Sequence, residues 1–338
     1  MYSASSQSAP TTQQNATTGK AAGSFHVDYV GATDPEVIVA NLEFIFMADC
    51  QLGAFASFSG MDAADVVSYA ARGMRVEEGP RIDGFEWDAD RYADAIAAAN
   101  DLRPEFVVMG GDMVDDPASE EQLEAVLRIT SRLDASIPMF WVPGNHDIAA
   151  DTVKPTRHSI DKYREVFGPD YYAFDRGPIR FLVLDTVVLD SPQQVPDELD
   201  EQLAWFEREV DRAGEQQRQV ILFGHHPLFV AEAGEPDSYW NLPRELRRHL
   251  LEVIHRGRIK NAFAGHWHRN SIARDGDIWQ AVLNDIRESV IVARRCDARW
   301  LVMASSDRSS GDRDSLAVQN GVEWLGFGRH GVELLKRC

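Results

Sequence analysis

The chain has 338 residues, of which 44% are hydrophobic and 26% are charged, as is typical of a folded globular protein. This composition excludes global disorder and a collagen-like fibre, and only three cysteines (Cys50, Cys296 and Cys338) exclude a disulfide-stapled miniprotein. With 34 basic and 54 acidic side chains the net charge is −20, so the average field repels nucleic acid and anionic membranes. We therefore expect no nucleic-acid partner and no membrane partner.

Residues 1–24 are rich in Ser, Thr, Gln and Ala, and their few apolar side chains predict a flexible tail. The tail lacks the apolar core of a secretory signal, and no stretch approaches the ~18 apolar residues of a membrane span. An odd, sparse cysteine count suits a reducing compartment, which predicts a cytoplasmic location. Residues 25–338 are predicted to form a single domain. Residues 54–84, which show weak periodicity, are predicted to be an insertion or lid near the functional site.

Short apolar runs alternate with helical patterns along the rest of the chain. In chain order, the pattern predicts a strand over 37–48, a helix over 90–99, a strand over 106–109, a helix over 120–133, and strands over 138–142 and 179–184. It then predicts a helix over 199–213, a strand over 219–223, a helix over 244–256, and strands over 259–264, 300–305 and 321–327. This alternation predicts an α/β fold, in which ligands gather beyond the carboxyl ends of strands.

Five polar clusters directly follow five of these expected strands. They are Asp49-Cys50-Gln51, Gly111-Asp112-Met113-Val114-Asp115, Gly144-Asn145-His146-Asp147, His225-His226-Pro227 and Gly265-His266-Trp267-His268. Carboxylate, amide and imidazole donors together suit first-row divalent metals such as Mn, Fe or Zn. Residues two apart lie on one side of an extended segment, so Asp49 and Gln51 can converge, as can His266 and His268.

The five clusters, in this order between about Phe44 and Asn270, resemble the calcineurin-like metallophosphoesterase superfamily. The glutamine at Gln51, where that superfamily usually has histidine, resembles its branch of calcineurin-like phosphoesterase-domain-containing Ser/Thr phosphatases. The stretch from Tyr239-Trp240-Asn241-Leu242 onward is also similar to that branch. The resemblance implies a four-layer sandwich, in which two mixed β-sheets are flanked by helices.

The resemblance also implies a binuclear metal centre. Metal one would be held by Asp49, Gln51, Asp112 and His268. Metal two would be held by Asp112, Asn145, His225 and His266. Two divalent ions with two carboxylate ligands leave roughly +2 at the site, which attracts phosphate despite the acidic background. Hydroxide formed from water between the metals would attack phosphorus.

Two further residues are implied in catalysis and two in substrate binding. His146 would stabilise charge or protonate the leaving oxygen, and Asp115 would orient His146. Arg269 is a candidate phosphate clamp, with Asn270 beside it, because Asp116 stands where calcineurin-type enzymes have an arginine. Gln51 is a weaker donor than imidazole, so metal one would bind loosely or be a harder ion such as Mn or Mg. Alternatively, Gln51 hydrogen-bonds near the metal without binding it.

The sequence thus predicts an enzyme, a dinuclear-metal-dependent phosphatase acting on phosphomonoesters, with phosphoserine or phosphothreonine in protein as candidate substrates. Two alternatives remain. One is a phosphodiesterase acting on cyclic nucleotides or lipid head groups, since the metal core is shared. The other is a binding scaffold that has lost catalysis, but the presence of both Asp112 and His146 argues against it.

Overall fold

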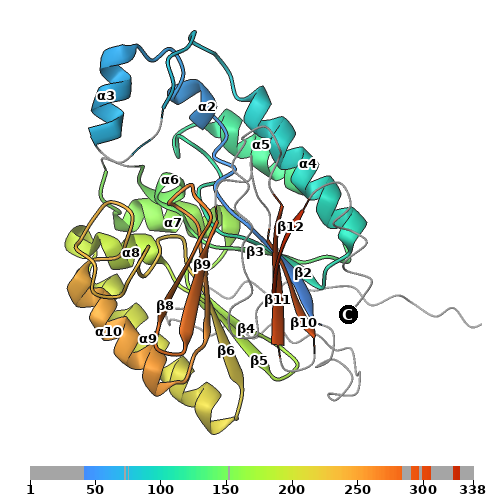
Figure 1. Ribbon diagram of the computed structural model, residues 1–338, viewed down its shortest axis with the longest axis vertical. Coiled ribbons are helices and arrows are strands. Elements are labelled where there is room, and N and C mark those ends of the chain that lie inside the picture. The colour runs from blue at the N-terminus through green and yellow to red at the C-terminus, as the bar shows by residue number, and fades with distance from the viewer. Residues whose placement is uncertain are drawn as a thin grey trace, which may run out of the picture.

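The structure is a computed structural model that describes residues 42–71, 74, 76–150 and 153–283, together with the backbone of residues 291–296, 299–305 and 323–327. The tail predicted over 1–24 lies outside the described residues, so it stays a prediction, as does the single domain over 25–338. Two six-stranded sheets face each other at the centre of the described part (Figure 1). Within that part no helix is long and apolar enough to cross a membrane.

The first sheet has the order β12-β11-β10-β1-β2-β3. Its strands are β1 (Glu43–Met47), β2 (Phe106–Met109), β3 (Met139–Trp141), β10 (Ile291–Cys296), β11 (Arg299–Ser305) and β12 (Glu323–Phe327). The strands β1, β2 and β3 are parallel, whereas β10 is antiparallel to β1. The sheet is therefore mixed, and its neighbouring strands β1, β2 and β3 end at one edge.

The second sheet has the order β4-β5-β6-β7-β9-β8. Its strands are β4 (Tyr172–Arg176), β5 (Ile179–Val183), β6 (Gln219–Phe223), β7 (Asn261–Ala264), β8 (Ser271–Asp275) and β9 (Ile278–Val282). The strands β5, β6, β7 and β9 are parallel, and antiparallel β4 and β8 close the two edges. This sheet is mixed as well.

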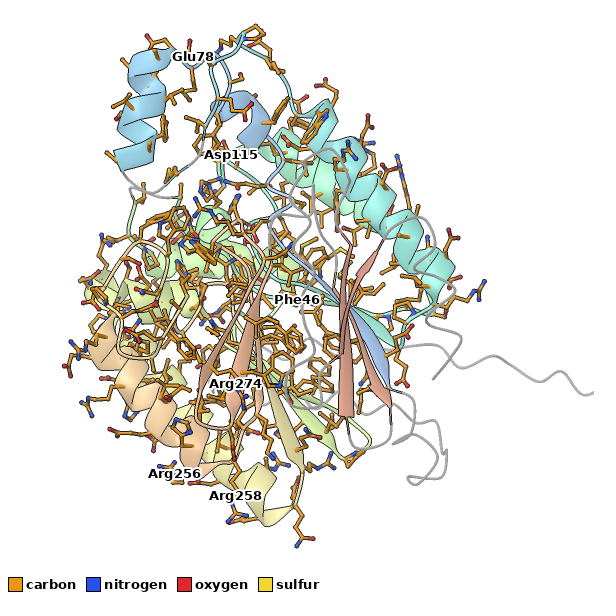
Figure 2. All side chains as sticks on the ribbon, in the orientation of Figure 1. Phe46, Glu78, Asp115, Arg256, Arg258 and Arg274 are labelled. Carbon is orange, nitrogen blue, oxygen red and sulfur yellow. The ribbon has the colours of Figure 1, made fainter. Side chains whose placement is uncertain are left out.

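Alternation along β1 divides its side chains between two cores. Phe44 and Phe46 point between the sheets, while Ile45 and Met47 belong to the core under the helices. Between the sheets, Phe44 stacks on Phe106 at 5.1 Å and meets Phe223 edge-on at 5.5 Å. Figure 2 shows Phe46 in this central position. Aromatic pairs in such geometries add to the free energy gained by burial, and they hold the two sheets together.

Helices cover both outer faces of the sheet pair (Figure 1). The longer helices are α4 (Glu86–Leu102), α5 (Glu120–Thr130), α7 (Arg157–Phe167), α9 (Pro196–Glu215) and α10 (Arg244–Arg256). The first three pack with the core of the first sheet, and the last two pack with that of the second. The predicted four-layer α/β sandwich is thereby confirmed.

Shorter helices lie in the connections. They are α2 (Ala54–Ser57), α3 (Ala63–Ala71), α6 (Asn145–Ile148), α8 (Thr186–Asp190) and the 3₁₀ turn η1 (Pro192–Gln194). The segment predicted as an insertion contains α2 and α3, and α3 has no buried residue. Its role as a lid stays a prediction.

Candidate metal centre

The five polar clusters meet where parallel strands of both sheets end. Asp49 follows β1 and Asp112 follows β2, and the two loops are tied by a hydrogen bond from Asp49 N to the Gly111 oxygen (2.9 Å). The clusters after β6 and β7 reach across from the second sheet. There, His266 N donates to Asp49 Oδ1 at 3.0 Å. The packing of the two sheets therefore brings together residues that are 217 positions apart.

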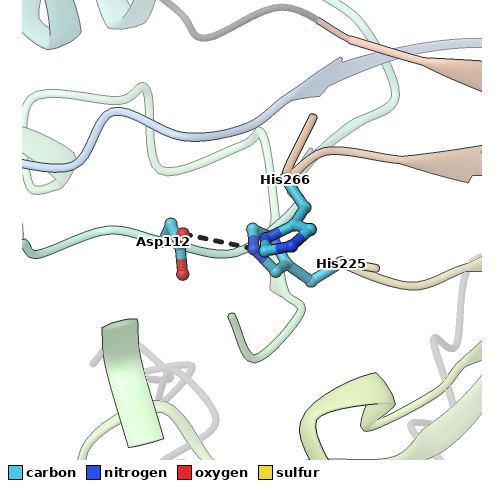
Figure 3. A group of neighbouring side chains, drawn as sticks. All are labelled: Asp112, His225 and His266. Carbon is cyan, nitrogen blue, oxygen red and sulfur yellow. Dashed lines mark ion pairs between the residues drawn. The ribbon is translucent and has the colours of Figure 1, made fainter. Parts of the chain in front are cut away.

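The carboxylates and imidazoles form two groups that share Asp112. Asp112, His225 and His266 form one group, and Asp49, Asp112 and His268 form the other. In each group the candidate ligand atoms lie within 4.8 Å of one another. His225 Nε2 lies 3.2 Å from Asp112 Oδ2 (Figure 3), and His268 Nε2 lies 3.5 Å from Asp49 Oδ1. This arrangement accommodates two cations bridged by one carboxylate.

The two predicted amide ligands lie beside these groups. Asn145 Oδ1 is 3.1 Å from His225 Nε2, in the group of metal two. The Gln51 side chain is 2% exposed, and its Oε1 has no hydrogen-bond partner among the described residues. A buried oxygen without a partner is costly unless a ligand satisfies it. The donor set therefore fits divalent cations, and Gln51 fits the position of an oxygen ligand.

The backbone at the site is unusual. Five of the seven predicted metal ligands have positive φ angles, namely Asp49 (57°), Gln51 (34°), Asp112 (54°), His266 (67°) and His268 (51°). Non-glycine residues rarely adopt this region, and each such conformation costs of order 1–3 kcal/mol. Strain of this kind is concentrated at functional sites, because the surrounding structure holds a side chain where function needs it.

Two glycines allow the close approach of the ligand loops. A Cβ added to Gly144 would lie 2.2 Å from both the Asp112 nitrogen and Asp112 Oδ1. Gly111 has a φ of +97°, and a Cβ there would lie 2.6 Å from His225 Nδ1. Only glycine leaves room for these contacts, which explains why glycine precedes Asp112 and Asn145.

Backbone carbonyls fix which ring nitrogen of two histidines faces the site. His225 Nδ1 donates to the Gly110 oxygen (2.9 Å), and His266 Nε2 donates to the Tyr239 oxygen (2.8 Å). A carbonyl can only accept, so the proton is on the bonded nitrogen. His225 Nε2 and His266 Nδ1 are thus left with free lone pairs for a cation.

Burial and charge set the protonation of the ligands. Burial alone would raise the pKa of Asp112, but His225 and His146 lower it overall, so Asp112 stays ionised. Burial and His225 lower the pKa of His266 to about 3, which keeps it neutral. Burial would lower the pKa of His225, yet Asp112 raises it to about 9. A cation beside these carboxylates would take the place of that proton.

His146 lies at the edge of the two groups. Its backbone nitrogen donates to Asp112 Oδ1 (2.8 Å), and its Nδ1 donates to the backbone oxygen of Asp115 (2.7 Å). The Asp115 carboxylate is farther away, with Oδ1 3.8 Å from His146 Nδ1. The Asp115 main chain therefore helps to orient the His146 ring through Nδ1.

The remaining predicted residues lie on the rim. Arg269 and Asn270 are exposed, and the Arg269 guanidinium lies 5.6 Å over the Trp267 ring. Tyr239, which is 42% exposed, packs its ring 4.7 Å from that of His266. These groups border the site without belonging to either ligand group.

Sequence reasoning assigned no role to Asp147. Its carboxylate is buried and accepts hydrogen bonds at 2.8 Å from the backbone nitrogens of Asp112, Met113 and Gly144. Asp147 thus shapes the loop that carries the shared ligand. Burial and the charge of Asp112 raise its pKa to about 7. The sequence feature that could have identified Asp147 is its place at the end of the Gly-Asn-His-Asp run, next to the predicted site residues Asn145 and His146.

The chain is a four-layer sandwich, and its strand ends bring two ligand groups together around one aspartate. This arrangement is that of the metallophosphoesterase class, which uses two divalent metals. The calcineurin-like phosphoesterase family matches residues 43–270, and the chain belongs to this family.

Individual relatives extend this result. Serine/threonine-protein phosphatase CPPED1 of Bos taurus is 34% identical over 197 residues, covering 56% of this chain and 62% of that protein. The chain thus spans less than two thirds of that relative's length. A 3',5'-cyclic-nucleotide phosphodiesterase of Nostoc sp. is 26% identical over 201 residues, covering 58% of this chain and 68% of that protein. The crystal structure of a dimetal phosphatase from Danio rerio has the same fold, with a TM-score of 0.57 at 17% identity, covering 77% of this chain and 95% of that one.

Proposed function

We propose that this protein is a phosphatase that hydrolyses phosphomonoesters, with phosphoserine and phosphothreonine in proteins as its substrates. The observation that carries the proposal is the pair of ligand groups sharing Asp112, with His146 bonded to the same aspartate. The name of the CPPED1 relatives supports the choice of phosphoprotein over other monoesters.

Seven residues would hold the metals. Metal one takes Asp49, Gln51, Asp112 and His268, and metal two takes Asp112, Asn145, His225 and His266. When bound, two such ions lower the pKa of a water nucleophile and neutralise charge on the attacked phosphate. The mixed oxygen and nitrogen donors favour Mn, Fe or Zn, and the neutral Gln51 amide favours a harder ion at metal one.

The chain's own residues handle the leaving group. Because His146 Nδ1 donates to the Asp115 carbonyl, Nε2 is the nitrogen that can transfer a proton. Protonated His146 would donate its Nε2 proton to the leaving alkoxide of serine or threonine. Arg269 and Asn270, which are exposed next to His268, would bind the phosphate oxygens.

Two other functions use the same metal core. Cyclic-nucleotide hydrolysis is supported by the Nostoc relative, though at lower identity than the phosphatase relatives. A scaffold without catalysis has no use for strained ligands or for a histidine at the position whose backbone nitrogen bonds to Asp112. The sparse, odd number of cysteines supports a reducing, cytoplasmic location.

The test compares a monoester with a diester on the metal-loaded full chain. We expect p-nitrophenyl phosphate to be hydrolysed faster than bis(p-nitrophenyl) phosphate, with each of Mn²⁺, Fe²⁺, Zn²⁺ and Mg²⁺ tried separately. Peptides phosphorylated on Ser, Thr or Tyr would then be compared. Preference for the diester would assign a phosphodiesterase, and two bound metals without hydrolysis of any substrate would assign a scaffold.

A further inference from the structure

The Asp115 carboxylate accepts hydrogen bonds from two side chains of the segment that follows β1. Its Oδ1 accepts from Gln51 Nε2 at 3.1 Å, and its Oδ2 accepts from Ser57 Oγ at 2.5 Å. Ser57 is the last residue of α2, and Figure 2 shows Asp115 next to this helix. Asp115 thus connects the loop after β2 to Gln51 and to the end of α2.

This contact decides how the Gln51 amide is turned. An ionised carboxylate has only acceptor atoms, so the NH₂ end of Gln51 must face Asp115. The opposite end, Oε1, is then directed into the buried surroundings, where it has no partner among the described residues. Without a hydrogen-bond acceptor such as Asp115 beside its NH₂ group, a glutamine amide can present either end to a cation. Its NH₂ end cannot bind a cation.

We propose that Asp115 is a positioning residue for metal one, which acts by holding the Gln51 amide with its oxygen toward the cation, and that Ser57 holds Asp115 in this role. The inference rests on the proposed function, because it supposes the metal centre. It assigns to Asp115 a different partner from His146, whose ring is bonded to the Asp115 main chain.

The loop around Asp115 does not depend on the carboxylate. The Asp115 nitrogen donates to the Leu52 oxygen (3.1 Å) and to Gln122 Oε1 (3.1 Å), and the Asp116 nitrogen also donates to Gln122 Oε1 (2.9 Å). Asp115→Ala therefore leaves the main chain in place. It also leaves the carbonyl that orients His146, so a change in metal binding reports on the side chain.

The experiment measures Mn²⁺ bound per chain by equilibrium dialysis, so that it needs no turnover. Gln51→Ala identifies which binding step belongs to metal one. Asp115→Ala, which removes both acceptor oxygens, should weaken that step about tenfold, as is typical when a group that orients a ligand is removed. Ser57→Ala should weaken it less. Asp116→Asn, which removes a charge from the next, exposed residue, should leave it unchanged.

A double-mutant cycle separates orientation from charge. In the wild-type background, Gln51→Glu places a new carboxylate beside that of Asp115, and the two repel each other. In the Asp115→Asn background, position 115 supplies the hydrogen-bond donor and position 51 the acceptor. The gain in metal-one affinity from Gln51→Glu should thus be larger in the Asp115→Asn background than in the wild type.

Equal gains in both backgrounds, or unchanged metal-one affinity in Asp115→Ala, would overturn the proposal while two metals still bind. A wild-type chain that binds no metal would instead overturn the proposed function.

Discussion

Replacing Gly144 by alanine tests whether the close contact of the ligand loops is needed for metal binding. Gly144 has φ −103° and ψ 168°, a conformation that alanine adopts readily. The substitution therefore adds a methyl group without a change in backbone preference. Its effect should come mainly from contact with Asp112, which supplies the three atoms nearest the new Cβ.

The magnitude follows from the distance. The new Cβ would lie 2.2 Å from the Asp112 nitrogen, whereas ordinary contacts begin at 3.4 Å, so the two loops must separate by about 1.2 Å. The clashing atom is in the main chain, so no rotamer change relieves it. We expect overpacking to lower the free energy of unfolding by about 1–3 kcal/mol. A displacement of about 1 Å of the shared ligand should lower turnover about 100-fold.

The measurements are urea unfolding of the metal-free protein, Mn²⁺ binding, and hydrolysis of p-nitrophenyl phosphate. Gly234→Ala is the matched control, because a Cβ at Gly234 would meet nothing within 4 Å. If Gly144→Ala kept wild-type metal affinity and turnover, the tight packing of Asp112 against Gly144 would not matter to the site.

Three other predictions follow from single contacts. Asp112→Asn should abolish turnover and lower the metal content, because both ligand groups include Asp112; near-normal hydrolysis would refute the bridging role. His146→Ala should lower kcat by about 10²–10⁴-fold with metal content unchanged, since the backbone bond to Asp112 remains; loss of metal would make His146 a ligand. Burial and the charge of Asp170 raise the pKa of Asp185 well above its usual value. Ionising Asp185 therefore costs more in the folded than in the unfolded protein, so this residue lowers the free energy of unfolding as the pH rises above about 4. Asp185→Asn, which keeps the helix cap, should therefore raise the free energy of unfolding more at pH 8 than at pH 5, by up to about 1.4 kcal/mol per pH unit; a gain equal at both pH values would contradict this reasoning.

The local pattern of apolar residues predicted the central strands and the helices α4, α5, α9 and α10, but it missed α7, β4, β8, β9 and β10. The strand predicted over 219–223 and the helix predicted over 244–256 have those bounds in the structure. The helix predicted over 120–133 ends at Thr130, because the chain turns at Ser131, whose hydroxyl bonds to the Arg128 oxygen. Periodicity describes which face is apolar, but it is insensitive to where the last turn closes.

Some buried polar groups gave no signal in the sequence. Arg247 looks like one more charged residue of an amphipathic helix, yet it is fully buried and contacts the Leu228 and Glu235 carbonyls. The Glu235 carboxylate in turn accepts from three backbone nitrogens, at Val230, Ala231 and Glu232. These contacts fix the loop whose Tyr239 carbonyl bonds to His266. Such burial depends on partners distant in sequence, so composition alone does not reveal it.

The sequence by itself determined which donor groups follow which strands, since the alternation of apolar runs places each polar cluster at a strand end. Only the tertiary structure decided which atom of each donor faces the site. The amide of Gln51 is turned by Asp115, 64 positions away, and the ring of His266 is held by Tyr239, 27 positions away. The physical reason is that tautomers and amide orientations are set by hydrogen bonds, and these partners become neighbours only when strands distant in sequence pair, β1 with β2 and β6 with β7.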